Sequence, residues 1–272
     1  MTYPFGIDVS KWQGAMDWQC AKDAGVAFAF VKATEGASWV DPTFAYNWAE
    51  LERLNIPHGA YHFFRPKQAV TQVEQFVAIA GEDAKLVLDL EDTGELDRSA
   101  MTVKTLRALE LIKQLTGKYP IVYSRYTWLN SNVIMSMMPE VDYWLAQYRY
   151  PLPYPLYTQE YPTELIAAPI GIERQQIKFH QSGERGNGGK YGAQSRYIDT
   201  DRFIGTNEEL VSYFGGTSET QPEQPPTSET RLYQARVIAG VLNVRSSPEI
   251  ADNIVGQLTE GAIVDVFEER EG

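Results

Sequence analysis

Residues 86–92 read Leu-Val-Leu-Asp-Leu-Glu-Asp. The leucines recur at every second position, which is the period of a β-strand, so they are expected to share one buried face. Asp89 and Glu91 are then expected to project together from the opposite face. Two carboxyl groups held close together do not both ionise easily, so one of them keeps its proton to a higher pH than usual. A protonated acid beside an ionised one can cleave a glycosidic bond, and we therefore predict the catalytic site at this pair.

Short apolar runs alternate with longer helical patterns on both sides of this segment, up to about residue 205. The predicted strands are Phe5–Val9, Ala27–Ala33, His58–Phe64, Lys85–Glu91, Ile121–Ser124, Tyr143–Tyr148 and Ile177–His180. The predicted helices are Trp18–Ala24, Pro42–Leu54, Ala69–Ala80, Thr102–Thr116 and Asn130–Met137. This alternation is typical of a β/α barrel or an open α/β sheet. In a barrel the active residues lie at the C-terminal ends of the strands, where Asp89 and Glu91 fall.

The predicted helix over Thr102–Thr116 has apolar residues at a spacing of three, namely Val103, Leu106, Leu109, Ile112 and Leu115. Gly117 follows them and is a suitable C-terminal cap.

Residues 215–230 read GGTSETQPEQPPTSET and contain no large apolar residue. This composition predicts an extended, solvated linker between a catalytic domain at 3–214 and a small all-β part at 231–272. Short strands in the second part are predicted at Ala235–Ile238, Val241–Arg245, Ile254–Gly256 and Ala262–Phe267.

The chain of 272 residues carries 24 Lys and Arg against 36 Asp and Glu, a formal net charge of −12 at pH 7. No basic run interrupts this acidic composition, so nucleic acid is not an expected partner. Cys20 is the only cysteine, which excludes an internal disulfide. No stretch approaches the roughly 18 apolar residues that span a membrane. The N-terminal residues lack the basic and apolar segments of a signal peptide, so we expect neither export by that route nor membrane insertion.

Two further acids stand out by their position in the sequence. Asp8 ends the first strand, and Asp199 lies in Tyr-Ile-Asp-Thr-Asp at 197–201, just before the last short element. A lone acid is usually a helix cap or a solvated surface group, but four carboxylates around one barrel mouth would form an acidic cleft. His58 and His62 have the spacing of zinc ligands on a helix, but on a strand they would be roughly 13 Å apart. We therefore expect no metal and no cofactor.

Six motifs of the chain resemble glycoside hydrolase family 25, the lysozymes and phage endolysins of the muramidase type. They occur in the family's order over about residues 5–205 and comprise Gly6–Gly14, Phe30–Gly36, Gly59–Phe63, Asp89–Glu91, Trp144–Tyr148 and Ile198–Phe203. The resemblance implies an irregular β/α barrel that cleaves the β-1,4 bond from N-acetylmuramic acid to N-acetylglucosamine. The chain departs from the family at Phe179–Ser182, where a tryptophan-glutamine-tyrosine-serine stretch is common. A glycine-rich loop is predicted to follow at Gly183–Gln194.

The same resemblance implies roles for individual residues. Glu91 becomes the general acid, and Asp89 stabilises positive charge near the anomeric carbon or holds the substrate's acetamido group. Asp8 and Asp199 complete the acidic floor. The candidates for lining the sugar subsites are Tyr61, Tyr123, Trp144 and Tyr148.

Residues 237–266 are similar to bacterial Src-homology-3-type domains, which commonly attach lysins to cell walls. Only about 40 residues follow the linker, whereas such a domain needs about 60 and small cores are marginal at that size. We therefore expect a truncated, weakly stable module. The expected partner of the whole chain, as a monomer, is bacterial cell-wall peptidoglycan outside the cell.

Several alternatives stay open at this point. The absence of a signal peptide favours a phage endolysin held in the host cytoplasm until release, with a trimmed secreted autolysin as the other source. A chitinase-like glycosidase would use the same pair of acids, and a catalytically silent glycan-binding protein would keep them without activity.

Overall fold

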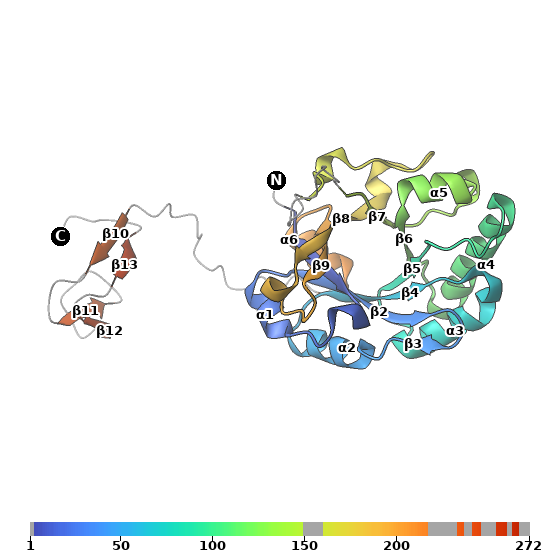
Figure 1. The fold of residues 1–272 in the computed structure, drawn as a ribbon. Helices are drawn as coiled ribbons and strands as arrows, with labels where there is room; N and C mark the ends of the chain where they lie inside the picture. The colour runs from blue at the N-terminus through green and yellow to red at the C-terminus, as the bar shows by residue number, and fades with distance from the viewer. Residues whose placement is uncertain are drawn as a thin grey trace. The chain divides into compact units, whose positions relative to one another are not determined.

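The computed structural model of the chain describes residues 3–148 and 160–216 and the strand segments 233–236, 241–245, 254–259 and 263–266 (Figure 1). Residues 1–217 and 218–272 are two compact units. The first unit holds the barrel and every candidate site residue.

Among the described residues of the first unit, eight strands close into a barrel. They are β1 (Phe5–Val9), β2 (Phe28–Glu35), β4 (His58–Phe63), β5 (Leu86–Asp89), β6 (Ile121–Arg125), β7 (Tyr143–Ala146), β8 (Ile177–Asn187) and β9 (Tyr197–Phe203). Neighbouring strands from β1 to β8 run parallel, and β9 runs antiparallel to both β8 and β1. The short β3 (Trp39–Val40) pairs only with the end of β2. The predicted irregular α/β barrel is confirmed.

The helices surround this barrel (Figure 1). They are α1 (Trp18–Asp23), α2 (Phe44–Arg53), α3 (Ala69–Ala80), α4 (Arg98–Thr116), α5 (Tyr126–Asn132) and α6 (Asn207–Tyr213). Of these, α6 packs on the apolar interior of the barrel at its N-terminal end. Short 3-10 turns occupy Lys11–Gln13, Pro66–Gln68, Met135–Met137, Thr163–Leu165, Arg174–Gln176 and Gly188–Tyr191. In the part of the chain that the structure describes, none of the helices combines the length and the apolar character needed to cross a membrane.

The strands contribute to two apolar clusters, one inside the barrel and one between the strands and the helices. The strand residues that face inward form one cluster with Leu210 of α6, and they include Phe28, Phe30, Val87, Tyr123, Trp144, Phe179 and Phe203. The strand residues that face outward pack with the helices in a second cluster, which includes the three leucines of the segment 86–90. The predicted period of two is therefore correct, since Val87 lies inside the barrel and its leucine neighbours lie outside.

Aromatic rings fill the barrel interior so closely that position 6 has no room for a side chain larger than that of glycine. A Cβ atom on Gly6 would lie 2.4 Å from the ring of Phe28. The Phe28 and Phe214 rings meet with their centroids 6.5 Å apart, and Phe214 directly follows α6. Because the N-terminal end of the barrel is closed in this way, the interior is open to ligands from the opposite mouth.

The segment predicted as a loop at Gly183–Gln194 is largely regular structure. β8 continues to Asn187 and pairs with β9, with register shifts on either side of Gly183. A Cβ atom on Gly186 would lie 2.6 Å from Thr200 Cγ2, so this glycine permits the close approach of β9. The glycines read as signs of a loop, but here they mark an irregular strand.

The helix predicted over Thr102–Thr116 begins four residues earlier than expected. The Asp97 carboxylate caps it by accepting a hydrogen bond from the Ala100 N–H (2.8 Å), and Gly117 ends it at φ 76°. Val103 is 58% exposed and Leu115 is 38% exposed, because a spacing of three falls progressively behind the 3.6 residues of a helical turn.

Four strands are described within residues 218–272. β10 (Tyr233–Arg236) pairs with β13 (Ile263–Val266), and β11 (Val241–Arg245) pairs with β12 (Ile254–Thr259), all antiparallel. The predicted strands Val241–Arg245 and Ile254–Gly256 lie within β11 and β12. Those predicted at Ala235–Ile238 and Ala262–Phe267 overlap β10 and β13, and their residues 237, 238, 262 and 267 lie outside the described residues. Of the predicted linker, residues 217–230 lie outside the described residues, and the likeness to a Src-homology-3-type domain stays a prediction.

Candidate active site

The four acids predicted from the sequence line a single pocket at the C-terminal mouth of the barrel. The pocket has a volume of about 120 Å³ and contains Asp8, Asp89, Glu91 and Asp199. Asp199 reaches this mouth because β9 is antiparallel, which places the beginning of that strand beside the end of β1. Residues from both ends of the barrel sequence are thus brought together.

Asp89 and Glu91 occupy different environments although they are two residues apart. β5 was predicted to run through Glu91, but it ends at Asp89. The Leu90 N–H donates to the Tyr123 carbonyl (2.9 Å), and Ser124 Oγ donates to the Leu90 carbonyl (2.6 Å). These bonds fix Leu90 outward and direct Glu91 into the pocket mouth, where it is exposed, whereas Asp89 beneath it is 4% exposed.

The pKa values of both carboxyl groups are raised. Burial and then the negative charge of Glu91 raise the pKa of Asp89 well above its ordinary value. Desolvation at the barrel mouth raises the pKa of Glu91, although Arg125, a hydrogen bond with Asp89 and Lys32 all act to lower it. The pair therefore holds a proton at a pH where ordinary carboxyl groups have lost theirs.

Asp8 is held by an amide that two tyrosines orient. Gln181 Nε2 donates to Asp8 Oδ2, and Gln181 Oε1 accepts hydrogen bonds from the hydroxyl groups of Tyr123 (2.5 Å) and Tyr148. Two donors at the oxygen leave the amide nitrogen facing the carboxylate. Gln181 lies within Phe179–Ser182, where the sequence departs from the common family motif. The resemblance to the family implied no role for Gln181.

Asp201 is a second residue that the sequence analysis missed. It is fully buried, and its Oδ1 atom accepts a hydrogen bond from Trp144 Nε1 (2.8 Å). Burial followed by the charge of Asp199 raises its pKa well above the ordinary value, although interactions with Trp144 and Asp8 act to lower it. The signal was present, because Asp199 and Asp201 repeat the spacing of Asp89 and Glu91 on a strand.

The predicted aromatic residues differ in how far they reach the pocket. Tyr61, Tyr123 and Trp144 line it, whereas Tyr148 joins the site through its bond to Gln181. Trp144 is 2% exposed and stacks on Phe30 with the ring centroids 4.4 Å apart. Its ring therefore forms part of the pocket floor.

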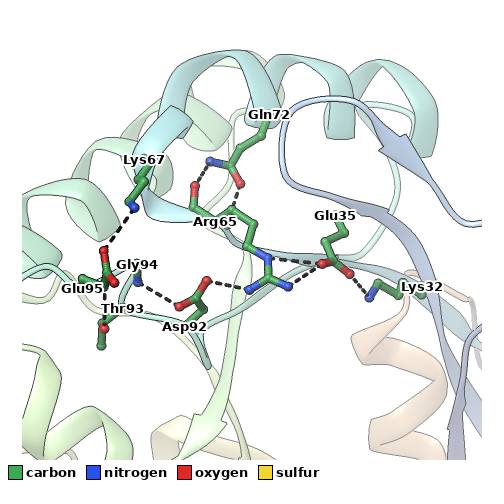
Figure 2. A network of polar contacts seen from close by, with 9 residues as sticks. All are labelled: Lys32, Glu35, Arg65, Lys67, Gln72, Asp92, Thr93, Gly94 and Glu95. Carbon is green, nitrogen blue, oxygen red and sulfur yellow. Dashed lines mark hydrogen bonds and ion pairs between the residues drawn. The ribbon is translucent and has the colours of Figure 1, made fainter.

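Lys32 is the cation of the pocket that the sequence analysis did not identify. It follows Phe28 and Phe30 at alternate positions of β2, so the period of the strand turns it inward. Its ammonium group lies 2.7 Å from Glu35 Oε2 (Figure 2). A positive charge at this place favours the ionised form of the neighbouring acids.

The two histidines considered as metal ligands serve packing. His62 faces the helices, where its Nδ1 lies 2.7 Å from Thr34 Oγ1 and its Nε2 lies 2.9 Å from Gln72 Oε1. The His58 ring meets the Trp48 ring edge-on, with centroids 4.4 Å apart. Within the described residues, no group of three or more His, Cys, Asp or Glu side chains could hold a metal ion.

Comparison with known proteins identifies the family. The sequence model of glycosyl hydrolases family 25 matches residues 7–181, which is more than half of the chain. The chain belongs to glycosyl hydrolases family 25. This family 25 chain is 32% identical over 224 residues to the uncharacterized protein YegX of Escherichia coli strain K12. The matched region covers 79% of this chain and 75% of that relative.

Relatives and solved structures with descriptive names agree with this family. Lysozyme M1 of Streptomyces globisporus is 29% identical over 159 residues, covering 53% of this chain and 54% of that protein. The structure of a family 25 glycosyl hydrolase from Bacillus anthracis matches with a TM-score of 0.61 and 27% identity, covering 79% of this chain and 94% of that one. The family 25 chain is therefore a glycoside hydrolase.

Proposed function

We propose that this glycoside hydrolase is an N-acetylmuramidase that cleaves peptidoglycan at the β-1,4 bond between N-acetylmuramic acid and N-acetylglucosamine. Family membership supports the reaction class. Two relatives add to it by name, Lysozyme M1 of Streptomyces globisporus and the N,O-diacetylmuramidase of Chalaropsis sp, which is 30% identical over 158 residues. Bacterial cell-wall peptidoglycan is thus the proposed partner, and the cell wall is the proposed place of action.

The observation that carries the proposal is the placement of an accessible acid above a buried one. Glu91 is exposed at the pocket mouth, so a glycosidic oxygen can reach it, whereas Asp89 lies beneath it and is 4% exposed. We assign Glu91 as the general acid because the leaving oxygen needs a proton from a group that is still protonated at the working pH. The raised pKa of the pair meets this requirement.

Asp89 has the complementary role. As the bond from the anomeric carbon to the leaving oxygen breaks, the Glu91 proton passes to that oxygen and positive charge develops on the sugar. An ionised Asp89 below the sugar stabilises that charge. An acetamido N–H of the substrate that donates to Asp89 would favour its ionised form and leave the shared proton on Glu91. Water then adds to the anomeric carbon and returns a proton to Glu91.

The remaining pocket residues hold the sugar. Asp8 and Asp199 form the acidic floor, and Gln181 keeps the Asp8 carboxylate in place. Tyr61 and Tyr123 offer ring faces and edges for the subsites, as do Trp144 in the floor and Tyr148 beside Gln181.

For the rest of the chain we propose a catalytic domain at 3–214, a linker at 215–230 and a partial Src-homology-3-type module at 231–272. The acidic, proline-rich composition of the linker supports this division. Limited proteolysis tests it, since early cleavage within 215–230 that leaves full activity agrees with the division, and early cleavage within 3–214 contradicts it.

The activity is tested by product analysis on purified peptidoglycan with the wild type, Glu91→Gln and Glu95→Gln. The Glu95 side chain is 92% exposed and lies outside the pocket, so the same substitution there is a matched control. New reducing ends on muramic acid, lost only in Glu91→Gln, agree with the proposal. Reducing ends on glucosamine would indicate a chitinase-like cut. Wall binding by the wild type without any product would indicate a silent glycan-binding protein.

A further inference from the structure

A second cleft, which we call the side cleft, opens beside the acid pocket. It has a volume of about 470 Å³, and its lining includes Lys11, Lys32, Glu35, Trp39 and Arg65. Trp12 and Lys32 line both the side cleft and the acid pocket, so the two are adjacent. A group attached to a sugar in the acid pocket can therefore enter the side cleft.

Four charged residues at the edge of the side cleft balance one another. Arg65 bridges Glu35 and Asp92, with a nitrogen–oxygen distance of 2.6 Å to each, and Lys32 contacts the other oxygen of Glu35 at 2.7 Å (Figure 2). Gln72 holds the Arg65 backbone, because its Oε1 accepts from the Arg65 N–H and its Nε2 donates to the Arg65 carbonyl. This quartet contributes no net charge to the side cleft.

Lys11 also lines the side cleft, and it takes no part in the ion pairs of this quartet. Its ammonium group lies 4.8 Å from the ring centroid of Trp12 and 5.0 Å from that of Trp39. Among the described residues around the side cleft, no carboxylate forms an ion pair with it. Asp41 also lines the cleft, but it is 2% exposed and its carboxylate accepts hydrogen bonds from the backbone of Lys11 and from Thr43.

The ring beside this ammonium group is unusually exposed. Trp12 is 75% exposed, although it separates the acid pocket from the side cleft. An exposed indole with a cation over its face offers apolar contact and positive charge to one ligand. In a protein of net charge −12 a free cation at this position is a specific attraction, since the overall field repels anions.

We propose that the side cleft binds the carboxylate-bearing peptide that muramic acid carries in peptidoglycan, with Lys11 as the cation that meets a peptide carboxylate. This inference rests on the proposed function, because it places muramic acid in the acid pocket. The peptide is attached to muramic acid through a lactyl group. A muramic acid in the acid pocket would therefore place its peptide in an adjacent cleft. A lactyl carboxylate alone contains a few atoms, whereas a cleft of about 470 Å³ accommodates a segment of peptide.

The test compares the kinetics of the full chain on two soluble substrates. One consists of glycan strands that carry their peptides, and the other consists of the same strands after an amidase has removed the peptides. We expect Lys11→Gln to raise KM about three- to fivefold on the peptide-bearing strands without changing kcat, and to leave the peptide-free strands unaffected. Lys11→Arg should restore the wild-type KM. The difference should vanish near 1 M salt, where the Debye length is about 3 Å.

Lys113→Gln is the matched control, because Lys113 is an exposed lysine 4.1 Å from the ring centroid of Tyr119 and lies outside the side cleft. It should change neither KM. Equal effects of Lys11→Gln on both substrates, or no effect on either, would overturn the inference. A larger effect on the peptide-free strands would also overturn it, because the amidase exposes the lactyl carboxylate and that group would then be the ligand.

A binding measurement separates this inference from the proposed function. If neither substrate is cleaved, the proposed function fails, and calorimetry with a soluble disaccharide-peptide still tests the side cleft. Weaker binding by Lys11→Gln than by the wild type and Lys113→Gln would support the inference. Equal binding by all three, or no binding by any, would contradict it.

Discussion

Asp8 of β1 and Asp199 of β9 lie directly opposite each other in antiparallel register. Their strands are the first and the last of the barrel, so the pairing that closes the fold also assembles the floor of the site. The pairing has an electrostatic cost, because the charges of Asp8, Glu184 and Glu91 raise the pKa of Asp199 beyond the effect of its burial. The mouth of the barrel is thus built from acids that resist ionisation.

Replacing Asp201 with Asn should change the pH dependence of the activity. The negative charge of Asp201 adds to burial in raising the pKa of Asp8 well above its ordinary value, and an asparagine removes that charge while its oxygen still accepts from Trp144. We expect the acidic limb of the pH–kcat/KM profile to move to lower pH, with kcat reduced less than tenfold, roughly the range of a positioning effect. An unshifted profile would show that Asp201 acts only in packing.

Replacing Asp89 with Asn should increase stability while it reduces activity. Asp89 is buried with a raised pKa, so the folded chain binds more protons than the unfolded chain above the ordinary carboxyl pKa, and stability falls as pH rises. The variant lacks this loss and should gain about 1–2 kcal/mol at pH 8 relative to the wild type, and less near pH 5. Activity should fall about 10²–10³-fold. Urea denaturation at the two pH values measures the gain, and a variant less stable at both would contradict the prediction.

Much of this site was predictable because its signals are local. The period of two in residues 86–92 separated the leucines from the acids, and the strand ends located the pocket. The helix over Ala69–Ala80 was predicted at its observed bounds, because its apolar residues repeat at helical spacing within one segment.

The parts that were missed depend on contacts between distant segments. Gln181 meets Asp8 across 173 positions of sequence, and Trp144 meets Asp201 across 57. No local pattern reports such pairs. β9 was not predicted as a strand. It pairs with a part of β8 that is rich in polar residues and glycine, and the two segments become extended because they pair when the barrel closes.

His62 should make the protein less stable in acid. Burial lowers its pKa from 6.5 to about 4, so the unfolded chain binds more protons than the folded chain between these values, and stability falls as pH decreases through that window. The loss amounts to at most about 3 kcal/mol. The stability advantage of the wild type over His62→Gln should therefore shrink between about pH 7 and pH 4. A constant difference across this range in thermal unfolding would contradict the assignment.

Gly6→Ala should destabilise the barrel. The added Cβ atom would lie 2.4 Å from the Phe28 ring inside the filled interior, and such overpacking costs about 1–3 kcal/mol. Gly189→Ala is the control, since the nearest atom to its Cβ would be at 3.7 Å. Denaturant unfolding should separate the two variants, and equal midpoints would show that the interior has more room than the ring contacts indicate.

The proton transfer from Glu91 is tested most directly by changing the leaving group. Glu91→Gln should lower the rate on peptidoglycan by about 10²–10⁴-fold, because a sugar leaving group requires protonation. On a synthetic glycoside of the same muramyl saccharide with a nitrophenolate leaving group, which departs without a proton, the loss should be less than about tenfold. Comparable losses on the two substrates would contradict the role of Glu91 as the general acid.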